Sequence, residues 1–175
     1  MNRILPKSVI STVFIICSLL FAAKALAEGK PNRKKTTTNP AQNSLALKVY
    51  KSPTCGCCGK WVAHMEKAGF KAETIDLKDL SPIKNRFGIK LQYQSCHTGS
   101  LNGYVFEGHI PAPVIKRFLA EKPSNAIGLA VPAMPIGSPG MEMGDRFDPY
   151  DVLMLKKDGT TVVYQHMGLQ DKLHK

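Results

Sequence analysis

The sequence predicts a single α/β domain that follows an N-terminal leader and a linker. Three observations predict this class. Strand-like and helix-like segments alternate after residue 45, two strands joined by a tight turn lie near the C-terminus, and the apolar fraction is 43%. That fraction is too high for a disordered chain. The 175 residues are enough to build one hydrophobic core even after a leader is removed.

Residues 1–27 have the pattern of a secretory signal peptide. A basic start precedes an apolar run over 9–23, and Ala25-Leu26-Ala27 offers the small residues that signal peptidase requires. We expect cleavage after Ala27. The apolar run is shorter than the roughly 20 residues that span a bilayer, so no stable membrane insertion is expected after cleavage. The mature protein is then expected in the bacterial periplasm, where thiols tend to oxidise.

Residues 28–44 are predicted to be a flexible basic linker, because they are polar, contain proline and lack apolar periodicity. The formal charge of +11 is distributed unevenly along the chain. The leader and the linker carry more than half of it, and residues 45–175 keep +5. A domain that is only mildly basic does not favour nucleic acid as a partner.

The first half of the domain predicts a strand–helix–strand unit. Residues 45–51 alternate apolar and polar side chains, as a strand does, and residues 60–68 place apolar side chains along one helical face. Gly69 ends this helix, and residues 70–77 form the next strand. Such a unit normally has a right-handed crossover.

A second helix is predicted over 81–87, with Ser81 as the N-cap and Pro82 as the first helical residue. Residues 90–99 are polar and are expected to form a loop. This loop contains the dipeptide Cys96-His97.

The second half predicts further alternation of strands and helices. Residues 101–107 indicate a strand, residues 113–121 a helix that begins at a proline, and residues 126–131 a short apolar strand. Residues 132–149 form a long loop rich in Pro, Gly and Met, and loops of this length are usually functional or disordered.

The last elements are two strands, 151–156 and 160–166, joined at Asp158-Gly159 as a hairpin. A strand–helix–strand unit followed by a hairpin is the order of a thioredoxin-like fold. We therefore expect a central mixed β-sheet flanked by helices, with residues 132–149 as a loop insertion.

Four cysteines remain after cleavage of the leader: Cys55, Cys57, Cys58 and Cys96. The first three form overlapping C-x-x-C and C-x-C motifs at a helix start, where the positive end of the dipole favours thiolate, the nucleophilic and metal-binding form. Cys96 can join them only through folding. Three cysteines within four positions constrain little chain, so the pattern favours metal or redox use over purely structural disulfides.

Soft donors elsewhere favour copper over other metals. Four thiolates suit Zn²⁺, an iron–sulfur cluster or Cu(I), but thioether sulfur selects Cu(I). Equal numbers of Cu(I) ions and thiolates carry no net charge, whereas one Zn²⁺ with four thiolates stays negative and is harder to bury. The secondary candidates for the site are His97, Met134, Met141, Met143, His166 and Met167. His64 is expected to be a surface or capping histidine, and His109 a cap or turn residue.

Four motifs also occur in a recognisable order. They are Cys55-Gly56-Cys57-Cys58 with Trp61, then residues 95–98 (SCHT), 108–111 (GHIP) and 131–142 (VPAMPIGSPGME). Together they resemble the CopG-type copper-resistance proteins, over about residues 45–167. The resemblance implies a thioredoxin-like fold and a multinuclear copper cluster bridged by Cys55, Cys57, Cys58 and Cys96. It also implies copper handling and redox interconversion in the periplasm.

Three functions therefore stand as hypotheses. The first is a periplasmic copper-binding protein for copper resistance, which holds several Cu(I) ions per monomer, with copper-export components as candidate partners. Whether it also acts as a copper oxidoreductase stays open. The second is a metal-free thiol–disulfide oxidoreductase with Cys55 as nucleophile and Cys58 as resolving cysteine. The third is a zinc structural domain.

Overall fold

The computed structural model describes residues 45–174. The predicted signal peptide (1–27) and linker (28–44) lie outside the described residues. Within the described part, no helix has the length and apolar character needed to cross a membrane.

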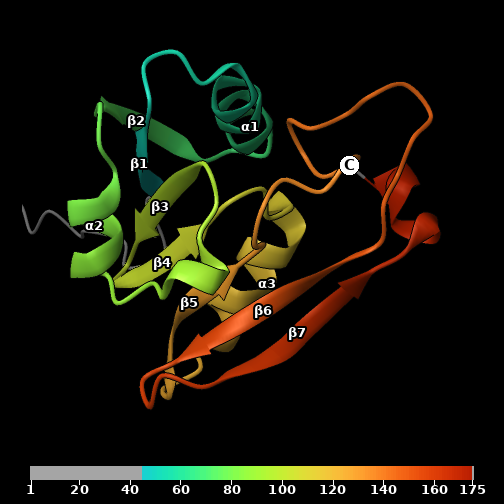
Figure 1. Cartoon of the computed structure of the whole chain (residues 1–175). Helices are drawn as coiled ribbons and strands as arrows, with labels where there is room; N and C mark the ends of the chain where they lie inside the picture. Colours follow the sequence, from blue (N-terminus) through green and yellow to red (C-terminus); the bar gives the residue numbers. More distant parts are fainter. Residues whose placement is uncertain (1–44, 175) are drawn as a thin grey trace, which may run out of the picture. The chain divides into compact units, whose positions relative to one another are not determined.

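One seven-stranded sheet organises the described residues, with strand order β2-β1-β3-β4-β5-β6-β7 (Figure 1). The strand pairs β1/β2 and β4/β5 are parallel, and the other neighbours are antiparallel. The predicted mixed α/β sheet is therefore confirmed, while the thioredoxin-like assignment stays a prediction. The strands are β1 (Ala46–Lys51), β2 (Lys71–Asp76), β3 (His97–Leu101), β4 (Tyr104–Glu107), β5 (Ala126–Ala130), β6 (Tyr150–Lys156) and β7 (Thr161–Met167).

Helices cover both faces of this sheet. The helical segments are α1 (Gly56–Lys67), α2 (Ser81–Arg86), α3 (Ala112–Glu121) and two 3₁₀ turns, Leu91–Tyr93 and Leu169–His174. Side chains alternate between faces along a strand. In β4, Phe106 packs in the main core with residues of α1 and α3, whereas Val105 packs in a smaller cluster with Phe87 and Tyr93, on the α2 side.

Helix α1 begins at Gly56, four residues before the helix predicted over 60–68. The N-cap is Cys55, whose Sγ accepts a hydrogen bond from the backbone N–H of Cys58 at 3.3 Å. The sequence offers no Ser, Thr, Asp or Asn at this position, so the usual capping signal was absent. The cysteine motif therefore forms the cap and first turn of the helix.

The prediction for the start of α2 was wrong in detail. Leu80 occupies the N-cap without a side-chain hydrogen bond, and Ser81 is the first helical residue. Asp79 Oδ1 instead accepts the N–H of Ser81 at 2.8 Å. The aspartate thus satisfies the N–H of the first helical residue, and the serine hydroxyl does not cap the helix as expected.

The loop predicted over 90–99 was also wrong in its second half, because β3 already begins at His97. The strand predicted over 101–107 is in fact the end of β3 and all of β4, separated by a turn at Asn102-Gly103. Both turn residues have positive φ, 51° and 82°, as a two-residue hairpin turn requires. Polar residues that are nevertheless buried, such as His97 and Thr98, concealed the strand from an apolar-pattern analysis.

The 132–149 loop connects β5 to β6 and runs past the start of α1 (Figure 1). At Gly140, where φ is +88°, a Cβ atom would lie 2.7 Å from the Cys57 carbonyl oxygen and 2.9 Å from the Trp61 nitrogen. Only a glycine permits this close approach to the helix. The predicted hairpin of β6 and β7 follows, with Asp158 accepting the N–H of Thr160 at 2.8 Å.

Candidate metal centre

The topology of the sheet brings the distant Cys96 to the cysteine motif. Strands β1 and β3 are antiparallel neighbours, with Lys51 opposite His97. The chain leaving β1 and the chain entering β3 therefore meet at the same end of the sheet. The Sγ atoms of Cys55, Cys57, Cys58 and Cys96 all lie within 4.8 Å of one another.

The four sulfurs are in two chemical states. Cys55 and Cys58 form a disulfide, while Cys57 and Cys96 are free thiols with their Sγ atoms 3.8 Å apart. Cys57 Sγ is also 3.5 Å from Cys55 Sγ. Cys58 is fully buried, and the other three are partly exposed. One disulfide and two free thiols therefore lie within the same group of four sulfurs.

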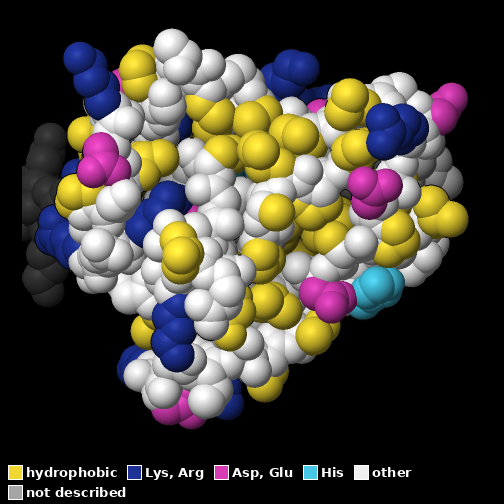
Figure 2. Space-filling model, in the orientation of Figure 1, with side chains coloured by type: hydrophobic (Ala, Val, Ile, Leu, Met, Phe, Trp, Pro, Cys, Tyr) yellow, Lys and Arg dark blue, Asp and Glu magenta, His cyan; other side chains and the backbone are white. Residues whose placement is uncertain are grey.

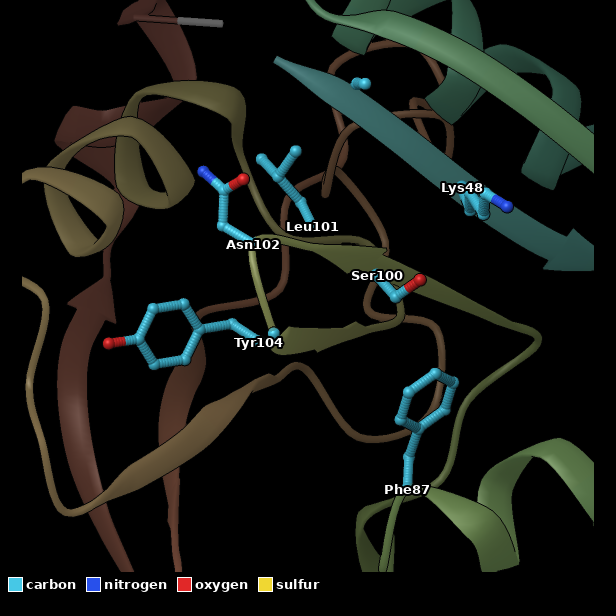
Figure 3. Close-up of a pocket in the computed structure, with 8 residues that line it drawn as sticks. Lys48, Phe87, Ser100, Leu101, Asn102 and Tyr104 are labelled. Carbon is cyan, nitrogen blue, oxygen red and sulfur yellow. The ribbon is translucent and has the colours of Figure 1, made fainter. Parts of the chain in front are cut away.

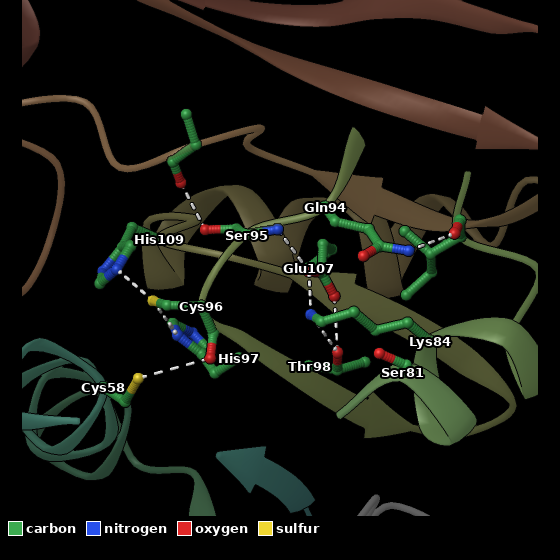
Figure 4. Close-up of polar contacts among 12 residues, drawn as sticks. Cys58, Ser81, Lys84, Gln94, Ser95, Cys96, His97, Thr98, Glu107 and His109 are labelled. Carbon is green, nitrogen blue, oxygen red and sulfur yellow. Dashed lines mark hydrogen bonds and ion pairs between the residues drawn. The ribbon is translucent and has the colours of Figure 1, made fainter. Parts of the chain in front are cut away.

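His109 lies directly beside this cluster. Its Nε2 atom is 3.0 Å from Cys96 Sγ (Figure 4). Its Nδ1 atom is 2.8 Å from the Pro139 carbonyl oxygen. A carbonyl oxygen can only accept, so Nδ1 carries the proton and the Nε2 lone pair faces the sulfur. Burial lowers the pKa of His109 and keeps the ring neutral. This is the arrangement of an imidazole prepared to bind a metal.

Sequence reasoning missed this contact of His109 with Cys96, since His109 was expected to be a cap or turn residue. The residue follows β4 and is fully buried. The only signal in the sequence was its place in the 108–111 motif, because nothing local to the residue predicts its contact with Cys96.

His97 is a second imidazole at the same cysteine. Its Nδ1 atom lies 3.3 Å from Cys96 Sγ, and its ring centroid lies 4.3 Å from that of Trp61. Its Nε2 atom is buried without a hydrogen-bond partner among the described residues. Burial, followed by the nearby His109 and Lys84, holds the pKa of His97 well below its usual range. His97 is therefore neutral at physiological pH.

Burial makes Cys96 a thiol in the absence of metal. It raises the pKa of the Cys96 thiol to about 12, and the neighbouring Cys57 adds to this effect. A bound cation would reverse the balance, because a metal ligand must be a thiolate. The centre therefore offers soft sulfur and neutral nitrogen donors, and no carboxylate joins either donor group in the described part of the chain.

The chain is similar to one family model and to solved structures. A family model described as "Protein of unknown function, DUF411" matches residues 93–141. The solved structure titled "Copper resistance protein copG- Form 2" is 41% identical with a TM-score of 0.67, and the match covers 70% of this chain and 98% of that one. The structure titled "Copper resistance protein copG- Form 1" is 42% identical with the same TM-score, covering 71% and 98%.

The chain belongs to the CopG family.

CopG membership confirms the resemblance seen in the sequence motifs. None of the curated proteins matches the sequence.

The secondary candidates are placed differently in this CopG-family chain. Met134 and Met143 are 47% and 51% exposed on the 132–149 loop, and Met141 is partly buried. Met167 packs in the main core, and His166 is exposed, with its Nδ1 atom 2.7 Å from Asp151 Oδ1. Of the imidazoles, the structure therefore brings His97 and His109 to the sulfurs, but not His166.

The surface around the centre is largely apolar. Figure 2 shows hydrophobic side chains, a class that includes Cys, Met and Pro, gathered between α1 and the 132–149 loop. A pocket of about 310 Å³ lies instead at the opposite end of β1 and β3, beside Lys48, Ser100 and Tyr104 (Figure 3). Its lining contains no thiol, imidazole or carboxylate.

Proposed function

We propose that this CopG-family protein binds copper for copper resistance in the periplasm, as several Cu(I) ions in a cluster bridged by Cys55, Cys57, Cys58 and Cys96. The observation that carries the proposal is the convergence of four sulfurs from two distant segments within 4.8 Å. The copper-resistance titles of the related structures support the choice of metal.

The donor chemistry favours Cu(I) over harder cations. Thiolate sulfur and neutral imidazole are soft or intermediate donors, and carboxylates are absent from the group that includes Cys96, His97 and His109. A cluster with equal numbers of Cu(I) ions and thiolates carries no net charge, which suits a partly buried position. His109 and His97 supply additional nitrogen donors at the Cys96 side.

The disulfide must be reduced before all four cysteines can bind metal. Reduction of the Cys55–Cys58 bond takes two electrons and two protons and yields two thiols. Each thiol then loses its proton to become a metal ligand. Copper loading is therefore expected to depend on prior reduction of the protein.

The test is copper analysis of reduced protein loaded with Cu(I), combined with X-ray absorption. We expect several copper ions per chain, sulfur coordination and a short metal–metal distance. Cys57→Ser and Cys96→Ser should each lower the copper content, whereas Met154→Leu, which removes a sulfur on β6, should not. Unchanged copper content in the triple serine variant of Cys55, Cys57 and Cys58 would refute the proposal.

A second candidate function is thiol–disulfide exchange without metal. It is favoured by the Cys55–Cys58 disulfide at the start of α1, where Cys55 is partly exposed and Cys58 is fully buried. An accessible nucleophile paired with a protected resolving thiol is the arrangement that exchange requires. In insulin reduction by chelator-treated protein, this function predicts loss of activity in Cys55→Ser and retention in Cys96→Ser. The copper-binding function instead predicts that Cu(I) binding is impaired in both variants.

A further inference from the structure

A buried ion pair lies on the α2 face of the sheet, behind the strand that follows Cys96. Lys84, Thr98 and Glu107 are all buried. Glu107 Oε1 accepts from Lys84 Nζ, and its Oε2 accepts from the Thr98 hydroxyl at 2.6 Å. Lys84 Nζ also donates to Thr98 Oγ1 at 3.1 Å. Figure 4 shows this network, with Lys84 reaching from α2 towards Thr98 and Glu107.

The network reaches the metal centre through one backbone group. Glu107 Oε1 also accepts the backbone N–H of Ser95, at 2.7 Å. Ser95 immediately precedes Cys96 and lies outside the β3 ladder, which begins at His97. The carboxylate therefore satisfies a donor that no neighbouring strand satisfies.

The same short segment is held from its other side by the 132–149 loop. The Ser95 hydroxyl donates to the Ala133 carbonyl oxygen, and the N–H of Ala133 donates to the Gln94 carbonyl oxygen at 3.2 Å. The residues before Cys96 are thus held by the Glu107 carboxylate and by Ala133. In this position Cys96 Sγ lies 3.8 Å from Cys57 Sγ and 3.0 Å from His109 Nε2.

Stability alone does not explain such a pair. Replacing a buried ion pair with apolar side chains of similar volume is often neutral or stabilising. An apolar replacement of Glu107, however, cannot accept the N–H of Ser95. What the carboxylate provides specifically is the position of the residue before Cys96.

We infer that the buried Lys84–Glu107 pair is a positioning device for Cys96: it fixes the Ser95 backbone and so holds the Cys96 sulfur against Cys57 and His109. The inference rests on the proposed function in one respect, that Cys96 binds metal. Lys84 and Glu107 touch no metal themselves and act only through Ser95.

Two matched double variants separate positioning from charge and from packing. Lys84→Met with Glu107→Gln removes both charges but keeps an amide oxygen for the Ser95 N–H and an amide NH₂ for Thr98. Lys84→Met with Glu107→Leu removes both charges and also the acceptor. If the leucine variant does not fold because the Thr98 hydroxyl is unpaired, adding Thr98→Val to both variants removes that hydroxyl.

The first measurement needs no copper. With the Cys55–Cys58 disulfide intact, a short bifunctional bromomethyl reagent that fluoresces on joining two thiols reports how often Cys57 and Cys96 lie together. We expect cross-linking to fall by about tenfold or more in the leucine variant, because it leaves the Ser95 N–H without an acceptor, and to stay near wild type in the glutamine variant, which keeps one. A monofunctional thiol reagent should modify Cys57 at similar rates in both.

The second measurement is Cu(I) affinity, determined by competition with a chromogenic chelator. The leucine variant should fall to the affinity of Cys96→Ser, and the glutamine variant should stay near wild type. Equal cross-linking in the two folded variants would overturn the inference. If wild type binds no Cu(I) while the cross-linking difference persists, the copper proposal fails and the positioning role stands.

Discussion

Pro139 shows how a backbone carbonyl can determine the chemistry of a side chain. Its carbonyl oxygen accepts a hydrogen bond from the Nδ1–H of His109, which leaves Nε2 unprotonated and directed at Cys96. The exposed His166 instead has its Nδ1 atom beside a carboxylate oxygen of Asp151. Identical residues thus acquire different roles from their partners, which a local sequence pattern does not record.

The matched pair His109→Gln and His166→Gln tests this difference. His109→Gln is expected to weaken Cu(I) binding by about tenfold or more, since it removes a nitrogen donor at Cys96. His166→Gln should leave the affinity unchanged because it lies outside the cluster. Chelator competition measures both, and equal effects of the two substitutions would contradict the assignment.

The two buried histidines also predict how stability depends on pH. The pKa values of His97 and His109 are lowered in the folded protein, chiefly by burial. Below about pH 6.5, the ordinary pKa of histidine, the unfolded chain binds protons that the folded chain does not. The stability of the metal-free protein should therefore be complete above this pH and fall as the pH drops.

Thermal unfolding of metal-free protein at pH 7.5 and pH 5.5 checks this expectation. The melting temperature should be lower at pH 5.5, and the difference should shrink in His109→Gln. A melting temperature that rises on acidification would mean that neither imidazole is held neutral by the fold.

At the scale of elements, the contact between the 132–149 loop and α1 sets the shape of the centre. Gly140 and Gly144 both have positive φ, at +88° and +59°, but only Gly140 lies against another element. Alanine at either position introduces backbone strain, and alanine at Gly140 also collides with the first turn of α1.

Gly140→Ala is therefore expected to destabilise the protein by about 1–3 kcal/mol more than strain alone would, and to weaken Cu(I) binding. Gly144→Ala serves as the control, because nothing lies within 4 Å of its added Cβ. Chemical unfolding gives the two free energies. Equal losses in both variants would show that the loop can move away from α1 at little cost.

The elements also show what the sequence could and could not predict. Alternating apolar residues predicted β1, which buries Leu47 and Val49 on one face. The Asp158-Gly159 turn predicted the β6–β7 hairpin. Strand β3 was missed since His97 and Thr98 are buried yet polar, and their partners come from α1, α2 and β4. The proximity of Cys96 to the motif depends on strand pairing across 38 residues, so local periodicity could not establish it.

For the whole molecule, the Cys55–Cys58 disulfide is expected to contribute little to the stability of the fold. Cys55 and Cys58 are three positions apart, so their bond closes a very small loop and restricts the unfolded chain little. The extended core between the sheet, α1 and α3 supplies the stability instead.

Reduction is accordingly expected to change copper capacity far more than stability. Reduced protein should keep nearly the melting temperature of oxidised protein but bind more Cu(I) per chain, because two further thiols become available. Calorimetry and copper analysis of both forms measure this. The same copper content in both forms would show that Cys55 and Cys58 are not ligands.

The contact between the rings of Trp61 and His97 has a practical consequence. Trp61 is the only tryptophan in the sequence, it is fully buried, and its indole N–H donates to the Ile110 carbonyl oxygen at 2.9 Å. Its ring therefore lies beside one of the two imidazoles at Cys96. Emission excited at wavelengths that tyrosine does not absorb therefore comes from one indole beside the cysteine cluster, so metal entry and thiol oxidation can be followed in real time without a label.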